Sequence, residues 1–186
     1  MVLKKKKFYK TEYFNPDNLE SLDVFSSRIL HLISSRISSN KDIVIICVGT
    51  DRATGDALGP IVGSILSSRS RIPVYGTLKT PVHALNLREC IHTIYTTHSD
   101  PIVIAIDASL GKPADVGMIT LSPAPLYPGI GVNKKLPAIG DISITGIVNL
   151  SGKPGLSLLQ STRLYTVSNM SRYIADGLIS ALSKEI

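Results

Sequence analysis

The chain has 186 residues, of which 44% are hydrophobic and 18% are charged, and its formal net charge is +6. This length suits one domain with one sizeable core, and the composition excludes an intrinsically disordered chain and a membrane protein. No apolar run approaches the roughly 18 residues that a membrane-spanning helix needs.

The chain begins with the basic stretch MVLKKKK. We expect residues 1–16 to be a flexible basic segment ahead of a single domain over residues 17–186. The apolar core of a secretory signal is missing after the lysines, which favours a cytoplasmic location. Because Lys4–Lys7 carry four of the positive charges and no nucleic-acid-binding signature follows, the sequence argues against a nucleic-acid partner.

The order of the predicted elements indicates an α/β protein. Apolar positions recur at spacings of three and four from Asp17 to Ile37, which predicts an amphipathic helix. The unbroken apolar run over residues 43–48 is typical of a strand that is buried on both faces of a mainly parallel sheet. The further elements that we expect are helices over 56–66, 82–95 and 164–182 and strands over 72–75, 101–106, 116–121 and 142–150. This alternation predicts a three-layer α/β/α sandwich.

Two aspartates follow the two most apolar strands. Asp56 lies in GTDRATGDALGP after the first strand, and Asp107 follows the second in IAIDASLG. Ligands of such sheets bind outside the carboxyl ends of the strands, so we expect both carboxylates on exit loops that converge on one pocket. Asp56 also fits a helix N-cap. Asp107 is more informative, because a carboxylate at the end of an apolar strand must be paired, hydrogen-bonded or ligating.

The histidines and cysteines carry weaker signals. His83 is expected to open a helix at the same edge as the two aspartates, where it fits a metal ligand, a proton shuttle or a structural residue. The remaining five are interpreted in two ways. His31, His92 and His98 fit surface or satisfied structural side chains, and Cys47 and Cys90 fit buried reduced thiols. A long loop rich in proline and glycine over residues 122–137 is typical of a functional loop. In it, Lys134 fits either a partner of the aspartates or a solvated lysine.

Several blocks, among them GTDRATGDALGP, IAIDASLG and PGIGVNKKLPAIGDISITGIVNLSG, resemble the YyaC-type sporulation proteins. The likeness extends over roughly residues 40–170. That family is similar to the spore germination protease and, more distantly, to the hydrogenase-maturation proteases, which implies a phosphorylase/hydrolase-like fold. The block around Asp56 resembles the first essential-aspartate motif of the germination protease, and the block at Asp107 resembles the second. GIGVNKK is similar to its glycine-rich loop, which ends here in Asn133 and Lys134.

The resemblance implies a peptidase in which Asp56 and Asp107 activate water without a cofactor. One aspartate would be ionised and the other protonated, because two carboxylates that share a site have their pKa values pushed apart. The residues expected to bind substrate or to support the pair are Gly49, Thr50, Asp51, His83, Gly129, Gly131, Asn133 and Lys134. The implied partner is a protein or peptide substrate, with spore proteins as candidates, in the cytoplasm of a sporulating cell or forespore.

Two alternatives stay open at this point. In the first, a divalent metal ion is bound between Asp56 and Asp107 with the help of His83; in the hydrogenase-maturation proteases the corresponding carboxylates bind nickel with a histidine. In the second, the chain is a non-catalytic sporulation factor that uses the same fold for protein binding.

Overall fold

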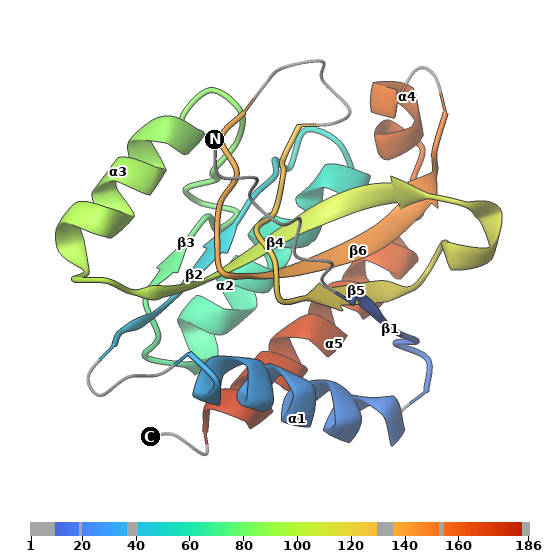
Figure 1. Cartoon of the computed structure of the whole chain (residues 1–186). Helices are drawn as coiled ribbons and strands as arrows, with labels where there is room; N and C mark the ends of the chain where they lie inside the picture. The colour runs from blue at the N-terminus through green and yellow to red at the C-terminus, as the bar shows by residue number, and fades with distance from the viewer. Residues whose placement is uncertain (1–9, 19, 37–40, 130–135, 153–154, 184–186) are drawn as a thin grey trace, which may run out of the picture.

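The computed structural model describes residues 10–18, 20–36, 41–129, 136–152 and 155–183 (Figure 1). Its strands are β1 (Glu12–Phe14), β2 (Ile43–Cys47), β3 (Val74–Tyr75), β4 (Ile102–Gly111), β5 (Ile119–Ser122) and β6 (Ile142–Leu150). Its helices are α1 (Glu20–Ser34), α2 (Leu58–Arg69), α3 (Leu87–Thr97), α4 (Gly155–Gln160) and α5 (Leu164–Leu182), with the short 3-10 helices η1 (Gly55–Ala57) and η2 (Pro113–Asp115).

The six strands form one sheet in the order β1-β5-β6-β4-β2-β3. The four strands β6, β4, β2 and β3 are parallel, while β5 runs antiparallel to β6 and β1 runs antiparallel to β5. Helices α1, α2 and α5 pack on one face, and α3 packs on the other (Figure 1). This arrangement confirms the expected three-layer sandwich with a mainly parallel central sheet.

The unbroken apolar run of β4 is explained by burial on both faces. Ile102, Ile104 and Ile106 belong to the core under α1, α2 and α5, whereas Val103 and Ala105 belong to the core under α3. Successive side chains of a strand point to opposite faces, so a strand with helices over both faces needs an apolar residue at every position.

Glycines allow α2 to lie directly against the ends of the central strands. A Cβ atom on Gly59 would overlap the carbonyl oxygen of Val48, and one on Gly63 would overlap that of Gly76. Gly76 itself has φ +95° and faces the carbonyl oxygen of Cys47 without room for a side chain. The close approach places the start of α2 at the carboxyl ends of β2 and β3.

Three boundaries differ from the sequence-based prediction. The domain begins before residue 17, because Phe14 of β1 is 6% exposed and its ring packs against Phe25 of α1. Helix α3 begins at Leu87 rather than at residue 82, because Val82 still forms a parallel bridge with Val48. The predicted C-terminal helix is correct from Leu164, and the short helix α4 precedes it.

Within the described parts of the chain, none of the helices is both long and apolar enough to cross a membrane.

Candidate functional site

The two candidate aspartates lie at the carboxyl ends of neighbouring parallel strands. Asp56 is in η1, shortly after β2, and η1 packs against β4. Asp107 lies inside β4, paired with Thr145 of β6, and so it is not on a loop as we expected. Because the pairing of β2 with β4 ends at Cys47 and Ile106, Asp107 is the first residue of β4 beyond that pairing. The expected convergence of the two exit segments is therefore present.

Asp107 is a buried carboxyl group with a strongly perturbed environment. It is 9% exposed, and its Oδ1 accepts a hydrogen bond of 2.8 Å from the backbone N–H of Ala108. Burial raises the pKa of Asp107 well above its ordinary value, the nearby charge of Asp56 raises it further, and the Ala108 hydrogen bond opposes both effects. The protonated form of Asp107 is therefore favoured.

Asp56 is half-buried, and its surroundings include effects that raise its pKa and effects that lower it. Burial raises the pKa of Asp56, while a backbone hydrogen bond from Thr50 and the charge of His83 lower it. Asp56 is not a helix cap, because the N-cap position of α2 is Ala57 and no side chain caps this helix. Burial has the largest effect and leaves the pKa of Asp56 raised, but Thr50 and His83 oppose it, so the pKa of Asp107 is raised further than that of Asp56. Among the described residues no direct hydrogen bond joins the two carboxyl groups, and the pair interacts through charge.

Gly49 and Thr50 build the backbone around Asp56. The N–H of Gly49 donates to the carbonyl of Val82 at 2.8 Å, and the N–H of Thr50 donates to the carbonyl of Asp56 at 3.1 Å. A Cβ atom on Gly49 would overlap the Asp56 carbonyl oxygen. Gly49 is therefore required for the close approach of three segments.

His83 lies near Asp56, but it does not open a helix. It belongs to a turn before α3, in which its N–H donates to Oδ1 of Asn86 at 2.8 Å. Its Nδ1 accepts a hydrogen bond of 3.3 Å from the N–H of Leu85, so a neutral His83 carries its proton on Nε2. Asn86, whose amide also donates to the carbonyl of Pro81, was missed by the sequence reasoning. Its signal was weak, because an asparagine before a helix is common.

The other predicted residues are placed less centrally. Asp51 is exposed, and its hydrogen-bond partner among the described residues is the neighbouring hydroxyl of Thr50. Gly129 lies in a turn with φ +82°. The predicted positions outside the described residues are Gly131, Asn133 and Lys134.

The residues interpreted as structural divide into three groups. His31 and His92 are exposed. His98 is satisfied by Asp42 at 2.9 Å and by the hydroxyl of Tyr75 at 3.2 Å. Cys47 is buried as expected, whereas Cys90 is only half-buried, because it lies on the rim of a cleft beside α3.

Asp56, Asp107 and His83 are the residues that the metal-bound alternative requires. Among the described residues, no three side chains of His, Cys, Asp or Glu are grouped so that they could hold a metal ion.

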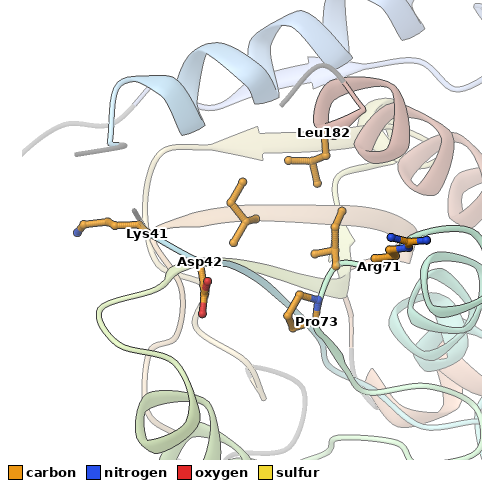
Figure 2. A pocket seen from close by; sticks show the side chains of 7 residues that line it. Lys41, Asp42, Arg71, Pro73 and Leu182 are labelled. Atoms are coloured by element: carbon orange, nitrogen blue, oxygen red, sulfur yellow. The ribbon is translucent and has the colours of Figure 1, made fainter. Parts of the chain in front are cut away.

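A hollow of about 250 Å³ at the opposite end of the sheet does not belong to the site (Figure 2). Lys41 and Asp42 line it at the start of β2, and Arg71 and Leu182 line it from other segments. Lys41 already forms an ion pair with Asp100. Neither candidate aspartate reaches this end of the strands.

Comparison with known proteins gives three likenesses. The family model described as "Protein of unknown function (DUF1256)" matches residues 17–177. The "Uncharacterized protein YyaC" of Bacillus subtilis (strain 168) is 49% identical over 147 residues, which are 78% of this chain and 72% of that protein. The NiFe hydrogenase maturation protease HycI from Thermococcus kodakarensis KOD1 has 18% sequence identity and a TM-score of 0.47, over 79% of this chain and 98% of that one.

Proposed function

The chain belongs to the DUF1256 family, and from this premise we propose that it is a peptidase in which Asp56 and Asp107 activate water. The observation that carries the proposal is the unequal environment of two neighbouring carboxyl groups: Asp107 is buried beside the charge of Asp56, whereas Asp56 is supported by Thr50 and His83. Pairs of titratable groups whose environments separate their pKa values are typical of acid–base catalysis.

The proposed reaction uses Asp56 as the base and Asp107 as the acid. Ionised Asp56 takes a proton from a water molecule while the water oxygen attacks the scissile carbonyl carbon. Protonated Asp107 donates a hydrogen bond to the carbonyl oxygen and stabilises the negative charge that develops there. When the tetrahedral intermediate collapses, the C–N bond breaks and the proton on Asp56 passes to the leaving amine.

The resemblance of the GDALGP and IAIDA blocks to the germination protease motifs supports the same assignment. It also supports a protein or peptide substrate in the cytoplasm of a sporulating cell or forespore, with spore proteins as candidates. The non-catalytic binding protein remains the second reading of the fold, since function depends on the site and not on the fold.

The test is hydrolysis of a mixed peptide library, followed by mass spectrometry. Wild-type protein should cleave the library, and Asp56→Asn and Asp107→Asn should each reduce the rate by at least about a hundredfold. The control is Asp23→Asn, which removes an exposed carboxylate in the first turn of α1 and should keep full activity. Full activity in both site variants would contradict the mechanism, and tight peptide binding without hydrolysis would support the binding protein instead.

A further inference from the structure

A cleft of about 560 Å³ lies between β3 and α3. One wall consists of β3 and the turn that contains His83. The other wall consists of Asn86, directly before α3, and of one face of α3, which presents Glu89 and Thr93 four residues apart. His83 lines this cleft and also acts on the charge of Asp56. His83 therefore links the cleft to the proposed catalytic site.

The strand in the cleft wall has unused backbone groups. Among the described strands, β3 is at the edge of the sheet and pairs with β2 alone. The N–H of Ile45 in β2 donates to the carbonyl of Pro73. In a parallel pair of strands, the backbone groups of successive residues point alternately toward and away from the partner strand. The N–H and C=O of Val74 therefore point away from β2. Neither group of Val74 has a hydrogen-bond partner among the described residues. An unpaired strand edge of this kind accepts an extended peptide as an additional strand.

The charge of the cleft indicates which side chain such a peptide would carry. Glu89 is the one Asp, Glu, Lys or Arg residue among the described residues that line it, and it is exposed. Thr80 and Thr93 add hydroxyl groups that can accept hydrogen bonds. The hydroxyl of Tyr75 is already used by His98. A carboxylate among neutral hydrogen-bond acceptors complements the ammonium of lysine or the guanidinium of arginine.

We propose that this cleft binds an extended segment of the peptide substrate, which pairs through its backbone with Val74 and presents a lysine or arginine side chain to Glu89. The inference rests on the proposed peptidase function and specifies its substrate class. A segment bound here passes His83, which acts on the charge of Asp56. The basic side chain therefore lies near the scissile bond but away from the reacting atoms.

Binding is tested separately from hydrolysis by using the Asp107→Asn protein. The probes are two pools of short fluorescein-labelled peptides of random sequence, one with lysine and one with norleucine at a fixed central position. Fluorescence anisotropy should show the lysine pool binding about tenfold more tightly, the size of one charge-assisted hydrogen bond. Adding Glu89→Gln should remove the difference, whereas adding Asp23→Asn should keep it. Equal affinity for the two pools, or a preference that survives Glu89→Gln, would overturn the proposal.

The place of binding is read from two groups in the cleft wall. Cys90 lines the cleft while Cys47 is fully buried, so Cys90 is the thiol to label. Burial and the charge of Glu89 raise the pKa of Cys90 to about 11. Alkylation is therefore followed at a mildly alkaline pH, below the lysine pKa of about 10.4, so that the probe keeps its charge. The lysine pool should slow alkylation of Cys90 and hydrogen exchange at the Val74 amide. Unchanged rates at both groups would show that the peptide binds elsewhere.

The two proposals fail in different ways. If the lysine pool binds in the cleft but the wild-type protein hydrolyses no peptide, the peptidase function is contradicted and the peptide site stands. If hydrolysis requires both aspartates but shows no preference for lysine or arginine, the peptide site is contradicted and the peptidase function stands.

Discussion

The negative charge of Asp56 raises the pKa of Asp107, which burial has already raised. The influence is unequal, because Asp56 is half-buried and supported by Thr50 and His83, whereas Asp107 is 9% exposed with one hydrogen bond from Ala108. Two adjacent carboxyl groups with such different surroundings lose their protons in separate steps. This separation lets one group act as a base while its neighbour still holds a proton.

Peptidase activity should follow a bell-shaped pH profile. The rate should rise as Asp56 loses its proton and fall as Asp107 loses its own. Both limbs should lie above the ordinary aspartate pKa, since both pKa values are raised, and the alkaline limb should lie further above it. The measurement is kcat/KM across pH on one peptide. A rate that is flat from acid to neutral pH would contradict the pair.

Replacing Asp107 should stabilise the protein at neutral pH while abolishing activity. A carboxyl group whose pKa is raised by folding contributes stability that is present below its unfolded pKa and is lost as the pH rises through its folded pKa. Asp107→Asn removes this loss and keeps an oxygen for the Ala108 N–H. Its free energy of unfolding should exceed that of wild type by about 1 kcal/mol or more at neutral pH.

The pH dependence of unfolding in urea checks this prediction. The advantage of Asp107→Asn should shrink as the pH falls toward the unfolded aspartate pKa. An equal difference between the two proteins at acid and neutral pH would show that titration of Asp107 is not its cause.

Removing His83 should move the acidic limb of the pH profile toward higher pH. The charge of His83 lowers the pKa of Asp56, whereas burial raises it. His83→Ala removes the lowering effect, so the pKa of Asp56 should rise. The control is His92→Ala, an exposed histidine on α3, which should leave the limb in place. The limb is measured from kcat/KM, and a direct carboxyl titration of Asp56 by NMR provides a readout that does not require activity.

Much of the site could be predicted from sequence because it depends on local apolar pattern. Unbroken apolar runs identify β2 and β4, and the parallel arrangement of such strands brings the residues after them to one edge. The nearness of Asp56 and Asp107 follows from these two facts alone. The extension of β4 beyond Asp107 could not be predicted, because it depends on pairing with the distant strand β6.

The remaining differences also come from contacts between distant segments. Val82 stays extended because it bridges Val48, and the side chain of Asn86 then organises the turn before α3. Local periodicity cannot show either contact. Strand β1 has only three residues and no alternating pattern, and it forms because β5 offers an antiparallel edge.

The close approach of Gly76, directly after β3, to the end of β2 predicts a large loss of stability for a small substitution. Gly76→Ala places a methyl group on the carbonyl oxygen of Cys47, at φ +95°. Gly117→Ala is a matched control, because φ is +94° and nothing lies within 4 Å of the added atom. Gly117→Ala should cost about 1 kcal/mol from backbone strain, and Gly76→Ala should cost about 2 kcal/mol more from overlap. Equal costs in urea unfolding would show that Gly76 does not lie so close to the carbonyl of Cys47.

The same measurement tests whether the domain begins at β1. Phe14 is 6% exposed, and its ring centroid lies 5.0 Å from that of Phe25. Arg28 of α1 also binds both carboxylate oxygens of Glu12, which ties the strand to the helix. Phe14→Ala should therefore lower the free energy of unfolding by about 3 kcal/mol. Tyr13→Ala, at a neighbouring position that is 52% exposed, should cost less than about 1 kcal/mol. A flexible lead-in would give the same small cost for both, because neither ring would then be buried by folding.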